Sequence, residues 1–113
     1  MNHIKILPLI ITLFFSSIAN AAKWSGPTDI RKIYPHSNNN GVGTIYFSFG
    51  TMINPSACSE NWLIALRKDN KLSSEIYSLI LSAFTTDKKV NYYTGGCDDS
   101  GFPLLLHIQL DKS

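Results

Sequence analysis

Two cysteines, Cys58 and Cys97, offer the most distinctive side-chain chemistry in this chain of 113 residues. A thiol can bind a metal ion, attack a substrate, fill a core or form a disulfide. A zinc site needs Cys and His ligands at close spacing, but His36 and His107 lie far from both cysteines in sequence. A catalytic thiol needs a nearby base and a lowered pKa, and no pattern around either cysteine indicates such a group.

The N-terminal segment, "MNHIKILPLIITLFFSSIANAAKW", has the pattern of a secretory signal. Lys5 precedes a short apolar run, and Ala19-Asn20-Ala21 fits the A-x-A pattern of a cleavage site. The run is shorter than the about 20 apolar residues of a membrane-spanning helix, although an N-terminal anchor helix is the alternative. We expect residues 1–21 to be a signal peptide, with cleavage after Ala22 as the alternative. Residues 22–113 are then expected to be one exported domain, periplasmic or secreted from a bacterium, that does not span a membrane.

Export favours one use of the two thiols. Two cysteines in a short exported chain most simply pair, so we predict a Cys58–Cys97 disulfide. The full chain has a formal net charge of +2, and loss of Lys5 with the signal lowers it by one. A charge so close to neutral gives no electrostatic reason to expect nucleic acid as a partner.

Strands are the main elements that must position these residues. The first is expected over residues 28–34, ending at Pro35, which cannot donate a ladder hydrogen bond. The second is "TIYFSFGTM", whose β-branched and aromatic residues alternate between two faces. The short run at 62–68 predicts a third strand but is also compatible with the start of a helix. Two further strands are expected over residues 90–97 and 102–111.

One helix is predicted between the third and fourth strands, with Ser73 or Ser74 as its N-cap. Five residues at helical spacing predict a fully apolar face: Ile76, Leu79, Ile80, Ala83 and Phe84. The order strand, strand, strand, helix, strand, strand matches the OB-fold. We therefore predict a mainly β fold with one helix, a five-stranded OB-fold-like Greek-key barrel.

Alternation assigns faces within the last two strands. Tyr92 and Tyr93 are adjacent, so one should enter the core while the other is exposed and able to line a site. In the last strand, Leu104 should face one way while Leu105 and His107 face the other. His107 is then expected at solvent or at an interface.

Trp24 and two aspartates each suggest a function and a structural alternative. A tryptophan can stack on a sugar ring, but packing into a small barrel is the interpretation we favour for Trp24. Asp98 and Asp99 resemble an acid–base pair, yet they lie in "GGCDDSG", where Asp favours turns through local backbone bonding. No nucleophile with a base can be assembled from the sequence, so we expect no enzyme, no metal and no cofactor.

Several segments resemble the B subunits of subtilase cytotoxin and typhoid toxin. Lys23-Trp24-Ser25-Gly26 resembles their E-W-T-G start, and Ala57-Cys58-Ser59 resembles their A-C-S around a disulfide cysteine. The block "IYSLILSAFTTDKKVNYY" resembles their helix, T-T turn and following strand, and Gly96-Cys97 stands about where another of their cysteines falls. This chain is similar to those subunits, or to a wider set of small exported proteins that share the scaffold.

The resemblance implies an OB-fold protomer that assembles as a ring of five and binds sialylated glycans. The family's sugar pocket uses a Ser and an Asp after the Trp-x-Gly start, and a Tyr on the strand after the helix. Here Asp29 lies in the first segment, and Tyr34 stands where the serine is expected. Tyr92 and Tyr93 lie on the strand expected after the helix, and Thr94 aligns with the family's tyrosine on that strand.

Two functional hypotheses follow from these observations. The first is an exported, non-enzymatic binding module, similar to a toxin B subunit, that recognises cell-surface glycans as a homopentamer and pairs with a toxin A subunit. Its glycan-binding residues would come from one set: Trp24, Asp29, Tyr34, Tyr92, Tyr93 and Thr94. The alternative is a small periplasmic protein that binds another protein, as an inhibitor or accessory factor.

Overall fold

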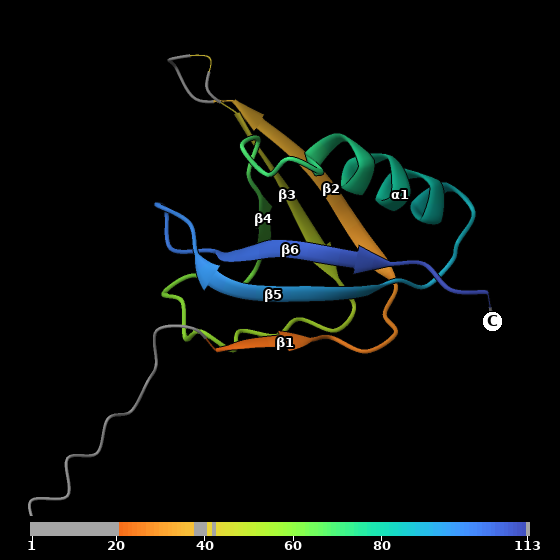
Figure 1. Ribbon diagram of the computed structural model, residues 1–113, viewed down its shortest axis with the longest axis horizontal. Coiled ribbons are helices and arrows are strands. Elements are labelled where there is room, and N and C mark those ends of the chain that lie inside the picture. Colours follow the sequence, from red (N-terminus) through yellow and green to blue (C-terminus); the bar gives the residue numbers. More distant parts are fainter. Residues whose placement is uncertain (1–20, 38–40, 42, 113) are drawn as a thin grey trace, which may run out of the picture.

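A computed structural model describes residues 21–37, 41 and 43–112. The fold is mainly β with one helix, as predicted (Figure 1). Its elements in chain order are β1 (Ala22–Trp24), β2 (Ile30–Ser37), β3 (Gly43–Phe49), β4 (Ile64–Leu66), α1 (Ser73–Thr85), β5 (Asn91–Cys97) and β6 (Pro103–Gln109). The predicted signal peptide lies outside the described residues, except for Ala21. Within the described chain, no helix is long and apolar enough to cross a bilayer.

The strands form one six-stranded sheet in the order β1-β5-β6-β4-β3-β2 (Figure 1). Antiparallel pairing builds two halves, β1-β5-β6 and β2-β3-β4. The halves meet where β4 and β6 pair in parallel, with Ala65 opposite Leu104. An isolated bridge joins Thr28 to Val90 through N–H···O distances of 2.8 and 2.9 Å. The sheet has two edges, β1 and β2, so it is not closed and the five-stranded barrel is not confirmed.

Two strand predictions need correction. The strand β1 was not predicted, because three residues are too few to show an alternating pattern. The strand β2 continues beyond its predicted end at Pro35, which pairs with Ile45 of β3, to Ser37. Because β2 is an edge strand, a residue without an N–H is tolerated there.

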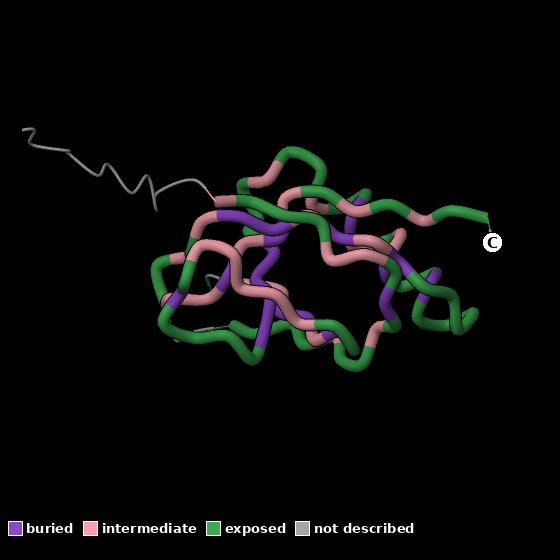
Figure 2. Tube along the Cα trace, turned by 90° about the horizontal axis from the view of Figure 1, so that it is seen from below, coloured by how far each residue is buried: buried purple, intermediate pink, exposed green. Residues whose placement is uncertain are grey.

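The main core lies between one face of the sheet and α1. Figure 2 shows the buried segments mainly along the strands, while the loops are largely exposed. The buried residues of this core are Phe47, Phe49, Ile64, Leu66, Ile76, Ile80, Ala83, Val90, Tyr92 and Leu105. The predicted helix face is only partly correct, because Phe84 in the last turn is 45% exposed. The predicted serine cap is wrong: Leu72 occupies the N-cap position, and its N–H donates to Asn70 Oδ1 at 2.9 Å.

A bulge in β6 changes the predicted faces of the last strand. Tyr93 pairs with His107 and Thr94 pairs with Leu105, so Leu106 is an extra residue on β6. A bulge of this kind shifts the alternation by one position. Leu105 therefore enters the main core, whereas His107 faces out, and the two do not share a face.

The predicted disulfide is present between Cys58 and Cys97, whose Cα atoms are 5.7 Å apart. It ties the loop before β4 to the end of β5. A second, smaller core lies on the outer face of the sheet near this bond. Its members are Tyr46, Leu63 and Ala65, with Phe102 and Leu104 packed against them.

Candidate functional site

Three rings lie side by side on the outer face of the half-sheet β1-β5-β6. Trp24 pairs with Tyr93, and Tyr93 pairs with His107, so one side chain comes from each strand. The ring centroids are 5.1 Å apart for Trp24–Tyr93 and 5.2 Å for Tyr93–His107, which are stacked at 25°. Trp24 also lies 6.3 Å from His107. We call these three residues the Trp24 platform.

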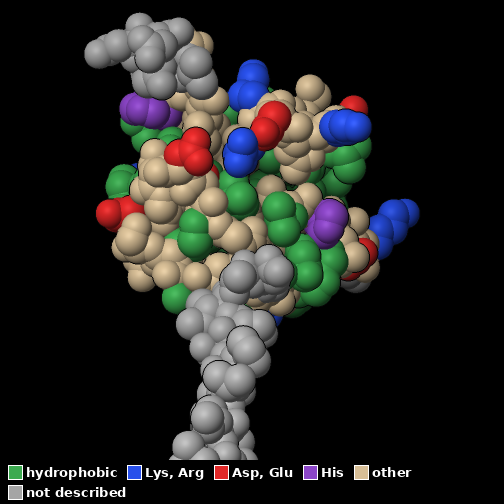
Figure 3. All heavy atoms as spheres, turned by 60° about the vertical axis from the view of Figure 1, so that its left-hand side comes forward, with side chains coloured by type: hydrophobic (Ala, Val, Ile, Leu, Met, Phe, Trp, Pro, Cys, Tyr) green, Lys and Arg blue, Asp and Glu red, His purple; other side chains and the backbone are tan. Residues whose placement is uncertain are grey.

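The platform is open to a ligand. Trp24 is 38% exposed, so the interpretation of this residue as a core plug is wrong. His107 is exposed, as predicted, and Tyr93 is half-buried. Figure 3 shows hydrophobic side chains close to each of the two histidines in view. Flat apolar ring faces with an indole N–H, a phenol and an imidazole at their edges suit a ligand that is itself apolar on one side and polar at its rim.

Backbone and side-chain bonds fix β1, and with it Trp24. The Ser25 N–H donates to Tyr92 O at 2.8 Å, and the Tyr92 N–H donates back to Ser25 Oγ at 3.1 Å. Farther back, Ser56 Oγ donates to Ala21 O at 2.5 Å and accepts from the Gly96 N–H at 2.8 Å. The platform is therefore held in place before any ligand arrives.

A glycine permits the close approach of β1 to β5. A Cβ built on Gly95 would lie 2.6 Å from Ala22 Cβ and 3.2 Å from Ala21 O. Real Cβ atoms do not approach a neighbour so closely, so any side chain at residue 95 would push β1 away. The Gly-Gly pair of "YYTGGC" thus has a packing role in the site.

Tyr92 and Thr94 lie inside the molecule, so neither is available to a ligand. The Tyr92 hydroxyl donates to Thr51 O at 2.7 Å and accepts from the Ile53 N–H at 3.2 Å. Burial raises the pKa of Tyr92 to about 12, against the smaller opposing effect of the hydrogen bond from Ile53. Thr94 is also fully buried, and its Oγ1 donates to Leu104 O at 2.6 Å.

Asp29 and Tyr34 lie away from the platform. Asp29 is exposed, and its carboxylate accepts from Arg31 Nε at 3.2 Å, which lowers the pKa of Asp29. Tyr34 is 40% exposed on the edge strand β2, at the other end of the strand order. Its hydroxyl is 2.9 Å from His36 Nδ1.

The structure therefore brings together Trp24 and Tyr93 out of the six predicted residues, and it adds His107. Sequence reasoning placed His107 at solvent but did not connect it to Trp24. The signal that joins them is the pairing register, which requires knowledge of the strand order β1-β5-β6.

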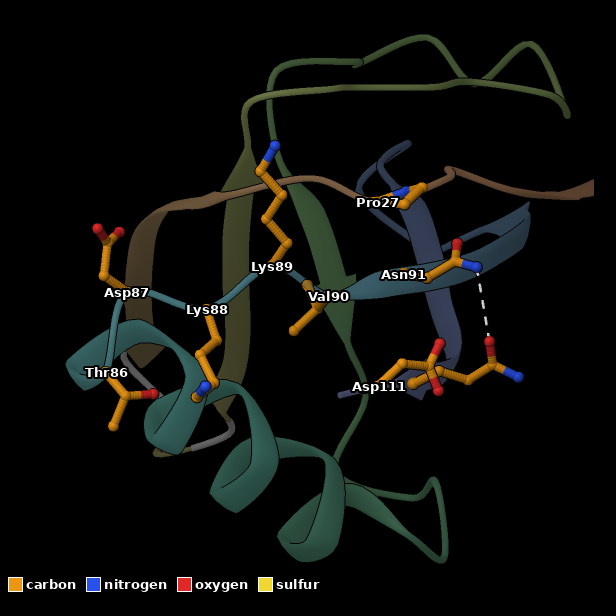
Figure 4. A pocket seen from close by; sticks show the side chains of 9 residues that line it. Pro27, Thr86, Asp87, Lys88, Lys89, Val90, Asn91 and Asp111 are labelled. Atoms are coloured by element: carbon orange, nitrogen blue, oxygen red, sulfur yellow. Dashed lines mark hydrogen bonds between the residues drawn. The ribbon is translucent and has the colours of Figure 1, made fainter. Parts of the chain in front are cut away.

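A hollow of about 600 Å³ lies at the end of α1, beside the start of β5 (Figure 4). It is lined by Pro27, Thr86, Asp87, Lys88, Lys89, Val90, Asn91, Gln109 and Asp111. In Figure 4 the Lys88 and Lys89 side chains extend in different directions, so their charges do not converge on one point. Asn91 Nδ2 donates to Gln109 Oε1 at 3.5 Å, so these two side-chain amides of the lining bond to each other.

Asp98, in the loop after β5, acts in a turn. Asp98 Oδ1 accepts from the Ser100 N–H at 3.0 Å and from the Phe102 N–H at 2.8 Å, as the turn interpretation predicts. In the part of the chain that the structure describes, no three His, Cys, Asp or Glu residues form a group that can hold a metal ion.

Fold and surface together define a small, mainly β, disulfide-bonded protein with an exposed aromatic platform. No family model, curated protein or solved structure matches this chain. The functional argument consequently rests on the residues and their geometry.

Proposed function

We propose that this protein is an exported, non-enzymatic binding module that recognises glycans through the Trp24 platform. The observation that carries the proposal is a cluster of three partly exposed rings, one from each of three neighbouring strands, with centroids 5.1 to 6.3 Å apart. Exposed aromatic residues that are held rigidly in one cluster offer a large contact area at low conformational cost.

Sugar rings fit the chemistry of this surface. One side of a pyranose is rich in C–H groups and packs on an indole face, while its hydroxyls need hydrogen-bonding partners at the rim. The indole N–H of Trp24, the hydroxyl of Tyr93 and the imidazole of His107 supply donors and acceptors of this kind. The bonds that fix β1 support tight binding, because little freedom is lost when the ligand docks.

The proposal includes an OB-like scaffold similar to a toxin B subunit. Five strands follow one another in the order β5-β6-β4-β3-β2, with α1 between β4 and β5 in sequence, which supports this scaffold. The bridge between Thr28 and Val90 draws together the two ends of that array. In this proposal the protomers assemble as a homopentamer, the ligand is a cell-surface glycan that carries sialic acid, and a toxin A subunit is the protein partner. Repetition of the site in a ring would add avidity to its own affinity.

A glycan array tests the proposal, with the full chain expressed in a bacterium and the oxidised product purified. We expect binding to one class of sialylated glycans, and loss of most of it in the variants Trp24→Ala and Tyr93→Ala. Phe84→Ala is the matched control, because Phe84 is an exposed aromatic residue on α1, away from the platform. A folded protein without glycan binding, or equal loss in all three variants, would contradict the proposal.

The second candidate function is binding of a protein partner in the periplasm, as an inhibitor or accessory factor. The observation that favours it is the edge position of β2, where residues 30–36 are mostly exposed. An unpaired strand edge can accept a strand from another protein. Capture of one defined envelope protein by the wild type, together with a monomeric mass by light scattering and a silent array, would favour this function.

A further inference from the structure

A second aromatic cluster lies on the outer face of the other half-sheet. Tyr34, His36 and Tyr46 contact one another across β2 and β3, with ring centroids 5.4 to 6.1 Å apart. Phe102 packs edge-on against Tyr46 at 5.0 Å, and Trp62 packs edge-on against Phe102 at 5.5 Å. We call these five residues the Trp62 cluster.

Trp62 is the most exposed large hydrophobic residue among those described, at 56%. Its indole nevertheless lies on a segment that is cross-linked to its neighbour. The Cys58–Cys97 disulfide ties the loop that carries Trp62 to the end of β5, where the loop that carries Phe102 begins. The Glu60 N–H donates to Gly101 O at 3.0 Å between the same loops. An exposed indole on a braced support has the properties of an anchor residue in a binding site.

A polar hollow of about 410 Å³ adjoins this cluster. It is lined by Gly43, Thr44, Arg67, Lys68, Asp69, Asp98, Asp99 and Ser100. The register connects the two features: Thr44 in the hollow pairs with His36 in the cluster, and Thr44 is two residues from Tyr46 on the same strand. The loop of Asp98 and Ser100 leads directly into Phe102.

The polar groups of the hollow are partly fixed in position. Arg67 donates to both carboxylate oxygens of Asp69, at 3.0 and 2.8 Å. Asp98 is held by the backbone N–H groups of its own turn. Arg67 has five N–H donors and uses two of them on Asp69, and a carboxylate oxygen can accept more than one hydrogen bond, so these groups retain capacity for sugar hydroxyls. Aromatic faces beside such groups form a combination that suits a sugar.

We propose that the Trp62 cluster and this hollow form a second carbohydrate site, which binds a neutral hexose. Three aspartates against one arginine and one lysine leave the hollow with an excess of negative charge, which disfavours a sugar acid. The volume lies within the range of about 300–1,000 Å³ that is typical of small-ligand pockets. This inference rests on the proposed glycan-binding function, and it gives each protomer two sites of different preference.

The two tryptophans of the chain separate the two proposals experimentally. The sequence contains only Trp24 and Trp62, so each site has one indole N–H of its own. In a ¹⁵N-labelled sample these give two indole signals, which the variants Trp24→Phe and Trp62→Phe assign. The probes are four methyl glycosides, those of galactose, glucose, mannose and N-acetylglucosamine, titrated singly into the oxidised protein.

We expect at least one glycoside to shift the Trp62 indole signal in a saturable way. The variant Asp99→Asn keeps this reporter and should weaken the binding about tenfold, because a charged acceptor is lost from the hollow. Asp111→Asn is the matched control, since Asp111 is exposed and lines the other hollow, at the end of α1. Trp24→Phe should leave the Trp62 titration unchanged.

Each result decides one of the proposals. A Trp62 signal that stays unmoved by all four sugars in a folded sample would overturn the second site, whatever the Trp24 signal does. Equal weakening by Asp99→Asn and Asp111→Asn would also overturn it. A Trp62 signal that responds while Trp24 is silent to these sugars and to sialyllactose would support the second site and refute the Trp24 platform.

Discussion

Reduction of the Cys58–Cys97 disulfide should remove a large part of the stability of this domain. The two cysteines are separated by 39 residues, so the bond closes a long loop in the unfolded chain. On the chain-entropy model, a loop of this length corresponds to about 4 kcal/mol of stabilisation at 25 °C. A typical small domain has a total free energy of unfolding of only about 5–15 kcal/mol.

Urea denaturation of the oxidised and reduced protein measures this difference. With a typical urea slope of about 1–3 kcal/mol per M, the midpoint should fall by roughly 1–4 M on reduction. The double variant Cys58→Ala, Cys97→Ala should resemble the reduced wild type and should not respond to the reductant. This comparison separates the covalent link from any other effect of the reductant.

A loss of less than about 1 kcal/mol would refute the entropy argument. It would mean that the ends of the loop stay close in the denatured ensemble without the bond, for example through residual structure between β4 and β5. The reduced sample also bears on the Trp62 cluster, because the bond braces the two loops that carry it. The indole signal of Trp62 should broaden or move on reduction, whereas the indole signal of Trp24 should change less.

Four further predictions can be checked with simple variants and with the wild-type protein. Tyr92→Phe leaves Thr51 O and the Ile53 N–H without their partner, so the free energy of unfolding should fall by about 1–3 kcal/mol in urea titrations. The pKa of Tyr92 is about 12 in the folded state and about 10 unfolded, so wild-type stability should fall as the pH rises from about 10 to 12, and the Phe variant should lack this loss. Gly95→Ala should displace β1 and lower the affinity for the proposed glycan ligand. Its effect on the thermal unfolding temperature of the same sample should be small, because the disulfide-linked core does not depend on β1. Intact-mass spectrometry of the exported protein should give a chain that begins at Ala22, and retention of residues 1–21 would contradict the signal peptide.

Much of the fold can be predicted from local patterns. The strand β3 alternates residue by residue, and α1 repeats its apolar residues at helical spacing, so both elements are predictable. The disulfide follows from the number of cysteines and the expected export. These features depend on neighbours in sequence, which a single chain displays directly.

The remaining features depend on contacts between distant residues. The three residues of β1 form a strand because β5 pairs with them, about 70 positions later in the chain. The extra residue Leu106 in β6 becomes visible only when the register with β5 is known, so Leu105 was assigned to the wrong face. The sequence predicts Trp24 in the core because a large ring is usually buried, but among the described residues no layer covers the face of β1 that carries it.

The pairing of the first strand with one of the last has a consequence for the time course of biosynthesis. Ala22–Trp24 leave the ribosome early, whereas their partners Tyr93–Gly95 are among the last residues to be made. The hairpins β2-β3 and β5-β6 can close locally, but β1 must wait for nearly the whole chain. Residues 22–24 therefore lack their strand partner until late, and the Trp24 platform is completed only in the finished molecule.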